Sequence, residues 1–282
     1  MSGYDYDLFT IGAGSGGVRA ARLAGGLGKR SGLAEAWTVG GTCVHRGCVP
    51  KKFYVFASHY GHDIEDAAAY GWTVEGVKFD WPTLVAAKKK ELSRLEGIYD
   101  GVLDNANVDL FKGRAVLEDA HTVRIGDQTI RAENIIISTG GTPFVPDMPG
   151  AELAITSNEI FDLDDFPKRL VINGAGYIAL EFACIFAGLG ADVAVVYRGD
   201  MPLRGFDDDV RKAVHREMTE KGVTFRFESN ISGLEKSGDG LRVQLDDGES
   251  IDCDQVLVAT GRVPNTDGLG LEAAGVGMAK NG

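Results

Sequence analysis

The sequence predicts an α/β fold made of two similar three-layer units, and three observations support this prediction. Residues 12–35 and 174–197 align without a gap and share seven identities in 24 positions. Each segment runs from a glycine-rich turn through an apolar helix to a short apolar strand. Each is followed, further along the chain, by short stretches of alternating apolar and polar residues, which is typical of antiparallel strands.

Length and composition are those of an ordinary soluble protein with about two domains. The chain has 282 residues, of which 44% are hydrophobic and 25% are charged. No apolar run approaches the roughly 18 residues of a membrane helix, and the start of the chain lacks the basic region of a signal peptide. We therefore expect a cytoplasmic protein. The net charge of −12 argues against nucleic acid or a membrane surface as a partner.

The four cysteines are too few for a disulfide-stapled secreted scaffold. Cys43 and Cys48 lie five residues apart, and in a cytosolic protein such a pair is more typical of catalysis or metal binding. Only His45 stands nearby as a further ligand, so we predict no metal site. Four further residues receive no chemical role: His59 and His62, which lack a third ligand, and Cys184 and Cys253, which are expected to be core or inert.

Secondary structure in the first half is expected in the order strand, turn, helix, strand, two helices and a β-meander. Pro50 stands where a helix can begin, because its missing N–H costs nothing there. The meander turns at Gly126 and Asp127. The expected ranges are strand 7–11, turn 12–17, strand 31–35, helices 53–70 and 82–105, and meander 108–137. The serine and glycine in 31–35 make that strand a weak one.

The second half repeats this order from about residue 150. A strand at 170–173 leads into a turn at 174–179, and an apolar helix follows. The next strand is expected at 192–197. A second meander is expected over 225–258.

Each glycine-rich turn has small residues at the three positions that a dinucleotide-binding turn requires. The first permits the tight turn, the second lets a pyrophosphate approach the backbone, and the third lets helix and strand pack closely. The helix that follows then directs free N–H groups toward the phosphates. Two matched copies favour two Rossmann-like nucleotide sites over ligand-free turns. The positions are Gly12, Gly14 and Gly17 in one unit and Gly174, Gly176 and Ala179 in the other.

In each unit, the residue at the end of the second strand indicates which nucleotide the unit binds. Glu35 places a carboxylate where ribose hydroxyls bind, which indicates FAD or an NAD-like ligand. The aligned position in the second unit is Tyr197, followed by Arg198, and an arginine there pairs with a ribose 2′-phosphate. Arg204 offers a second contact. The second site is therefore interpreted as NADP-binding, with solvated loop charges as the alternative for the two arginines.

The cysteine pair stands in a segment that suits thiol chemistry. A cysteine at a helix N-terminus near two lysines, Lys51 and Lys52, is expected to have a lowered thiolate pKa, which favours disulfide exchange. His45, between the cysteines, is expected to be structural.

The segment GGTCVHRGCVPKK (40–52) resembles the redox-active motif of the class I flavoprotein pyridine nucleotide-disulfide oxidoreductases, and within them the glutathione reductases. Further similar segments are STGG (138–141), GAGYIALE (174–181), YRGDMPLRGFD (197–207) and ATGRVPNT (259–266). The resemblance implies FAD and NADPH as cofactors and a redox disulfide between Cys43 and Cys48. It implies NADPH-dependent reduction of glutathione disulfide by a homodimer that serves glutathione metabolism and cell redox homeostasis.

The resemblance also implies a domain order in which an NADP domain is inserted into an FAD domain. The expected ranges are 1–142 for the FAD-binding domain with the cysteine pair, 143–263 for the NADP-binding domain, and 264–282 for the start of a returning FAD and central segment. Glutathione reductases continue with an FAD-binding Asp turn and an interface domain that supplies a His–Glu acid–base pair. We therefore expect this chain to be truncated at its C-terminus.

Roles for single residues follow from the resemblance. Lys51 would lie near the flavin and pair with Glu181, and Tyr177 would cover the nicotinamide pocket. Cys48 would exchange electrons with the flavin, and Cys43 would attack the substrate disulfide. The implied FAD contacts are Gly12, Gly14, Ser15, Gly16, Gly17, Glu35, Thr42, Cys43, Lys51, Ala115, Thr139 and Gly140. The implied NADP contacts are Gly174, Ala175, Gly176, Tyr177, Ile178, Glu181, Arg198, Arg204, Gly261 and Arg262.

Substrate choice is argued from charge. Arg19 and Arg22 lie three residues apart and therefore share one helix face. Two cations favour the anionic glutathione disulfide over the more cationic trypanothione, and Tyr99 matches a substrate-contacting tyrosine by position. Two alternatives remain: another reductase of the family, acting on trypanothione or thioredoxin, and a non-catalytic nucleotide-binding fragment that holds NADPH and reduces nothing.

Overall fold

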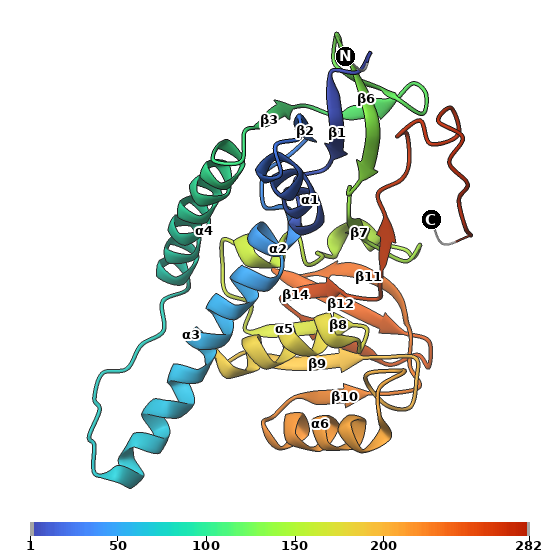
Figure 1. The fold of residues 1–282 in the computed structure, drawn as a ribbon. Helices are drawn as coiled ribbons and strands as arrows, with labels where there is room; N and C mark the ends of the chain where they lie inside the picture. Colours follow the sequence, from blue (N-terminus) through green and yellow to red (C-terminus); the bar gives the residue numbers. More distant parts are fainter. Residues whose placement is uncertain (1–2, 281–282) are drawn as a thin grey trace. The chain divides into compact units, whose positions relative to one another are not determined.

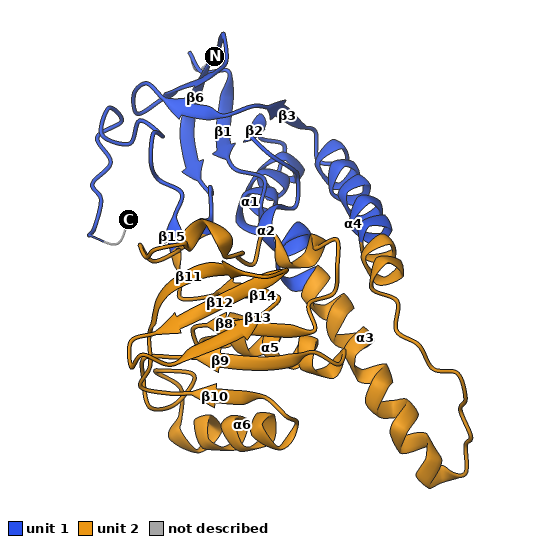
Figure 2. Ribbon diagram, turned by 180° about the vertical axis from the view of Figure 1, so that it is seen from behind, with its two compact units in different colours: residues 1–49, 89–142, 263–282 blue, residues 50–88, 143–262 orange. Residues whose placement is uncertain are grey.

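The structure, a computed structural model, describes residues 3–280 and is an α/β protein with two compact units (Figure 2). Unit 1 consists of residues 1–49, 89–142 and 263–282. Unit 2 consists of residues 50–88 and 143–262, so it interrupts unit 1 twice along the chain.

Unit 1 is built on a six-stranded sheet in the order β3-β2-β1-β6-β5-β4. The first four strands are parallel, and the last three form an antiparallel meander. The long strand β6 belongs to both parts, because its first half pairs with β5 and its second half with β1. The strands are β1 (Tyr6–Ile11), β2 (Ser31–Glu35), β3 (Val108–Lys112), β4 (Ala115–Leu117), β5 (Thr122–Ile125) and β6 (Gln128–Ile137).

The predicted meander over 108–137 is therefore wrong in its first strand. β3 follows a long helix, and this crossover brings it parallel to β2 rather than into a hairpin with β4 (Figure 1). Strand β2, predicted to be weak, lies inside the sheet. Its Gly32 is required there, because a Cβ at this position would lie 2.6 Å from Cδ2 of Phe9 on the neighbouring strand.

The parallel part of this sheet is covered on both faces. Leu33 packs with Val18 and Ala21 of helix α1 (Ser15–Gly26). Phe9 points to the opposite face, where it packs in a cluster with residues of the meander such as Val123. This alternation follows from the two-residue period of a strand.

Three helices and a 3₁₀ turn lie between β2 and β3. They are α2 (Gly41–His45), α3 (Cys48–Ala67), the 3₁₀ turn η1 (Ala68–Tyr70) and α4 (Trp81–Asp104). α3 begins earlier than the predicted residue 53, with Pro50 in its first turn, where proline is tolerated. Residues 50–88, expected within the FAD domain, pack with unit 2 because Tyr54 and Trp81 are buried beside Phe161 and Phe186. The functional boundaries stay a prediction.

Unit 2 contains a parallel sheet in the order β10-β9-β8-β14 and a three-stranded antiparallel sheet, β11-β12-β13. The predicted meander over 225–258 is thus wrong at both ends, because β10 and β14 join the parallel sheet. The elements are β8 (Arg169–Asn173), α5 (Tyr177–Gly188), β9 (Asp192–Val196), α6 (Asp208–Glu220), β10 (Thr224–Arg226), β11 (Ile231–Ser237), β12 (Gly240–Leu245), β13 (Ser250–Cys253) and β14 (Gln255–Val258).

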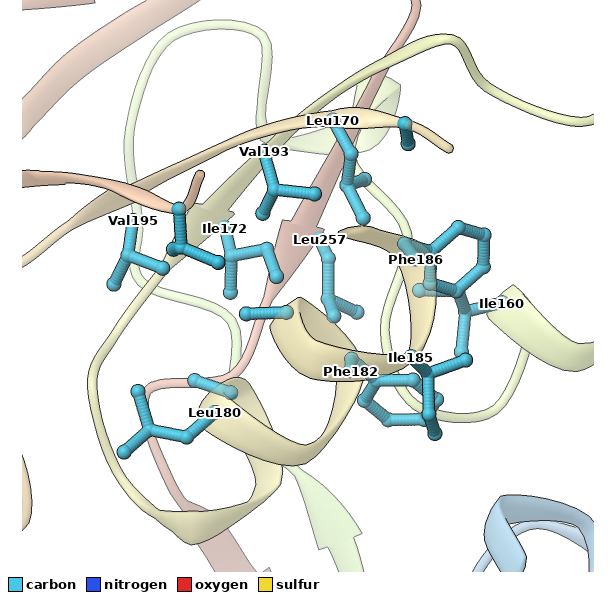
Figure 3. Packing of buried hydrophobic residues seen from close by; sticks show 14 of the residues in the cluster. Ile160, Leu170, Ile172, Leu180, Phe182, Ile185, Phe186, Val193, Val195 and Leu257 are labelled. Carbon is cyan, nitrogen blue, oxygen red and sulfur yellow. The ribbon is translucent and has the colours of Figure 1, made fainter. Parts of the chain in front are cut away.

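The core of unit 2 lies on both faces of its parallel sheet. Leu170 and Ile172 of β8 point toward Phe182 and Phe186 of α5 (Figure 3). Val171, between them, packs with the antiparallel sheet on the other face. The parallel sheet is therefore the middle one of three layers. Because α5 packs on one face of this sheet, the turn between β8 and α5 is held in place.

Short elements complete the chain. β7 (Gly141–Pro143) pairs with β15 (Arg262–Pro264) where the chain leaves and re-enters unit 1. Two 3₁₀ turns, η2 (Ala151–Leu153) and η3 (Ile160–Asp162), precede β8. Across residues 3–280, no helix has the length and apolar character needed to cross a membrane.

Candidate functional site

Unit 2 contains a cavity of about 710 Å³ at the carboxyl ends of β8, β9 and β14. In open parallel sheets this edge is where ligands bind. The cavity is lined by the turn between β8 and α5, the loop after β9, the loop after β14 and the segment that follows β7.

The turn between β8 and α5 has the geometry of a phosphate-binding turn. Gly174 has a φ of +115°, and a Cβ there would lie 2.5 Å from the carbonyl oxygen of Ala259. α5 has Gly176 as its N-cap and no side-chain cap, whereas the N-cap Asp207 of α6 accepts hydrogen bonds from two backbone N–H groups. The first N–H groups of α5 are therefore open to an anion.

Two arginines line this cavity from the loop after β9. Arg198 and Arg204 are both exposed, and no carboxylate in the part of the chain that the structure describes lies at ion-pair distance from either. Their positive charges are therefore available to a phosphate group.

The structure brings together all of the predicted NADP residues except Glu181, which lies outside the cavity one turn along α5. Sequence reasoning missed the apolar lining of this cavity, since it gave no site role to Phe206 or Ile231. Further missed lining residues are Pro143, Phe144, Pro146, Ser157, Asn173, Leu203, Asn230, Val258, Ala259 and Thr260.

Glu181 and Lys51 form the expected ion pair within unit 2. Lys51 Nζ lies 2.6 Å from Glu181 Oε2, and the lysine side chain is 13% exposed whereas the glutamate is 47% exposed. The ammonium also lies 5.0 Å from the ring centroid of Phe182 and 5.8 Å from that of Tyr177. The lysine is thus held at the start of α5, beside the cavity-lining Tyr177.

Unit 1 has a second turn of the same kind between β1 and α1. Gly12 has a φ of +101°, and a Cβ there would lie 2.4 Å from the carbonyl oxygen of Ser138. α1 has Gly14 as its N-cap and no side-chain cap. The carboxylate of Glu35 accepts hydrogen bonds from Ala13 N at 2.6 Å and from Trp37 N at 2.7 Å, which holds it beside the turn.

The cysteine pair lies directly against this turn. α2, which carries Cys43, begins at Gly41, where a Cβ would lie 2.7 Å from Cα of Gly14. Ser15, the first residue of α1, lies close enough to Cys43 to lower the pKa of its thiol. Both cysteines are free thiols, and the pair is near disulfide distance, with Cys48 exposed and Cys43 half-buried.

Burial and neighbouring groups set the acidity of the Cys43 thiol. Burial, followed by the hydrogen bond and the charge of Cys48, raises the pKa of the Cys43 thiol, although the hydrogen bond from Ser15 lowers it. Lys51, one of the two lysines expected near the thiols, forms the expected pair with Glu181.

Apart from Lys51, which belongs to unit 2, the other predicted FAD residues are spread over unit 1. Thr139 and Gly140 follow β6, where Asn265 holds them: Thr139 Oγ1 donates to Asn265 O at 2.8 Å. Ala115 is buried in the core, so it offers a ligand its backbone alone. The remaining ones, at the turn and on α2, are Gly16, Gly17 and Thr42.

The predicted substrate residues lie on α1 and α4. Arg19 and Arg22 are exposed, and Arg22 lines a groove of about 460 Å³ formed by the end of α1 and residues 102–106. Tyr99 is half-buried and packs on the cluster beneath α1.

The residues without a predicted role differ in burial. His45 has a structural setting, since its Nε2 lies 2.9 Å from the carbonyl of Val39 and its ring packs on Trp37. Cys253 is buried, which raises its pKa to about 11. Cys184, expected to be core or inert, is exposed, and desolvation raises the pKa of its thiol. Residues 3–280 contain no cluster of three or more potential metal ligands.

The two sheets and their glycine-rich turns define an α/β protein with Rossmann-like dinucleotide-binding units. The chain belongs to the pyridine nucleotide-disulphide oxidoreductase family, whose model matches residues 6–282. Members of this family use FAD and NAD(P)H.

Curated relatives cover the whole chain. It is 48% identical over 282 residues to a glutathione reductase of Burkholderia cepacia, and 47% identical over 275 residues to one of Nostoc sp.. These matches span 100% and 97% of this chain and 63% and 60% of the relatives. A trypanothione reductase of Leishmania donovani is 39% identical over 303 residues, with 98% of this chain and 62% of the relative covered. The chain thus spans less than two thirds of these relatives.

Proposed function

We propose that the protein reduces glutathione disulfide with NADPH, through FAD and a redox disulfide between Cys43 and Cys48. The observation that carries this proposal is the position of the cysteine pair, because helix α2, which carries Cys43, packs directly on the glycine-rich turn of unit 1. A nucleotide held by that turn therefore lies next to a pair of thiols at near-disulfide distance. The named relatives, two glutathione reductases at 47–48% identity, support the same substrate.

The residues of both units fit the proposed cofactors. In unit 1, the uncapped N-terminus of α1 suits a pyrophosphate, and the carboxylate of Glu35 suits ribose hydroxyls. In unit 2, the cavity joins the uncapped N-terminus of α5 to Arg198 and Arg204, which suits a dinucleotide with a 2′-phosphate. We therefore assign FAD to the domain of residues 1–142 and NADPH to the inserted domain of residues 143–263.

FAD, when bound, supplies the passage of an electron pair from NADPH to the cysteine pair. The thiolate of Cys43 attacks one sulfur of the substrate disulfide, forms a mixed disulfide with it and releases the first thiol. Cys48 then attacks the sulfur of Cys43, which releases the second thiol and closes the Cys43–Cys48 disulfide. Lys51, held by Glu181, supplies a fixed positive charge beside the cavity-lining Tyr177.

The positive charges on α1 support glutathione disulfide as the substrate. Arg19 and Arg22 are both exposed on α1, the helix that begins at the turn beside the cysteines. Their charges attract the carboxylates of an anionic disulfide. Tyr99 is the third residue proposed to contact it, and a homodimer is the proposed assembly.

The test is NADPH oxidation by the FAD-loaded protein with glutathione disulfide, trypanothione disulfide or oxidised thioredoxin as acceptor. The proposal expects turnover with glutathione disulfide in preference to the other two, and no turnover in a Cys43→Ser variant. Preferred turnover of another acceptor, or equal turnover by Cys43→Ser, contradicts it. NADPH binding without turnover on any disulfide would instead favour a nucleotide-binding role.

A further inference from the structure

We propose that Arg211, a residue of α6 outside the cavity, is a positioning residue that shapes the loop of residues 197–207 for a ribose 2′-phosphate. We name this segment the phosphate loop. It contains Arg198 and Arg204, which line the cavity, whereas Arg211 does not. The inference rests on the proposed NADPH site and deepens it, because it identifies what holds the two arginines in place.

Arg211 joins the phosphate loop to the start of α6 through one side chain. Its Nε donates to the carbonyl of Pro202 at 2.8 Å, and its Nη2 donates to the carbonyl of Met201 at 3.1 Å. Its Nη1 lies 2.8 Å from Asp208, and its Nη2 lies 3.7 Å from Asp200. The side chain is 18% exposed. A planar guanidinium with several fixed donors can satisfy these partners together, and a lysine ammonium cannot reproduce that pattern.

The carbonyls that Arg211 holds directly precede the strained point of the loop. Leu203 is buried and has a φ of +56°, a conformation that costs a non-glycine residue free energy and needs surrounding contacts to persist. The N–H of Leu203 donates to the carbonyl of Ala175 at 2.9 Å, in the glycine-rich turn. Arg204 follows at once. The position of that arginine therefore depends on a backbone shape that Arg211 helps to fix.

Charge gives Arg211 a second effect on the same loop. The loop and the start of α6 carry four carboxylates, at residues 200 and 207–209, close in sequence to the two cavity arginines. Unneutralised, they repel a phosphate dianion. Arg211 pairs with Asp208 and lies near Asp200, so it offsets part of that negative charge. Its loss therefore weakens binding of the 2′-phosphate specifically, and not of the rest of the nucleotide.

The test compares binding of 2′,5′-ADP and of ADP by calorimetry in the wild type, Arg211→Met, Arg211→Lys and Arg216→Met. Arg216 is an exposed arginine on the same helix, paired with Glu217 at 2.9 Å, and is the matched control. We expect Arg211→Met to weaken 2′,5′-ADP about tenfold, within the usual coupling between residues in one network, and to leave ADP unchanged. The affinity of Arg211→Lys for 2′,5′-ADP should lie between those of Arg211→Met and the wild type, and that of Arg216→Met should equal the wild-type value.

A combination of variants separates positioning from general structure. In an Arg198→Met, Arg204→Met background, Arg211→Met should cause a smaller loss of 2′,5′-ADP affinity than in the wild type, because only its effect on the loop charge remains. The proposal is overturned if Arg211→Met keeps the wild-type preference, weakens both ligands equally, or adds its full loss in that background. If the wild type itself does not prefer 2′,5′-ADP to ADP, the proposed NADPH site is overturned as well. The wild-type preference therefore distinguishes failure of the NADPH site from failure of the role proposed for Arg211.

Discussion

Replacing Gly174 with alanine tests the geometry of the glycine-rich turn in unit 2. The structure offers a matched control, because Gly190 has a similar φ of +99° and no atom within 4 Å of an added Cβ. Gly174, with a φ of +115°, would place that Cβ 2.5 Å from a backbone oxygen and 2.9 Å from its carbon. Both variants bear the cost of an unfavourable φ, and Gly174→Ala alone bears the overlap.

The magnitudes follow from these two costs. A positive φ costs an L-residue about 1–2 kcal/mol, so Gly190→Ala should lower the free energy of unfolding by that amount. Overpacking against backbone adds about 1–3 kcal/mol, so Gly174→Ala should lower it by about 3 kcal/mol in total. The difference of about 2 kcal/mol corresponds to about 4–8 °C in the unfolding temperature of a domain of this size.

The assay is thermal and urea unfolding of both variants beside the wild type, followed by titration with 2′,5′-ADP. Gly174→Ala should unfold at a lower temperature than Gly190→Ala and bind the nucleotide more weakly, because the overlap displaces the turn. Equal unfolding temperatures for the two variants, or wild-type nucleotide affinity in Gly174→Ala, would refute the reasoning.

Two further predictions concern the thiols and the ion pair. In a Cys184→Ser background, replacing Cys48 with alanine removes a hydrogen bond and a charge that raise the pKa of Cys43. The pKa therefore falls, and the pH profile of Cys43 alkylation should move to lower pH; an unchanged or higher midpoint contradicts this. Glu181→Gln leaves the mostly buried ammonium of Lys51 without a counter-charge and should cost about 2 kcal/mol in urea unfolding. Lys51→Met leaves a half-exposed carboxylate and should cost about 1 kcal/mol or less, so the reverse order would count against the burial argument.

The sequence predicted the repeated nucleotide-binding turns because their requirements are local. A tight turn, an approach to phosphate and a close helix–strand contact each demand a small residue at a fixed position. That is why Gly12 and Gly174 show the same close approach to a backbone oxygen in the structure. Arg198 was likewise predictable, since it follows closely on the second strand of its unit, and Arg204 lies six residues further along the same loop.

Features that depend on distant residues were not predictable in this way. The pairing of β3, β10 and β14 depends on crossovers, whereas their alternating sequence resembles that of a meander strand. The raised pKa of Cys43 depends on burial and on the neighbouring thiol, which no local pattern reports. The role proposed for Arg211 depends on two carbonyls nine and ten residues earlier in the chain.

An anaerobic absorption spectrum of the purified, FAD-reconstituted protein, before and after excess NADPH, tests the central proposal most directly. We predict a flavin band that NADPH bleaches, with a long-wavelength shoulder that disappears in a Cys48→Ser variant. That result would link the nucleotide site of unit 2, the turn of unit 1 and the cysteine pair in one electron path. A protein that retains no flavin, or a flavin band that NADPH leaves unchanged, would contradict it.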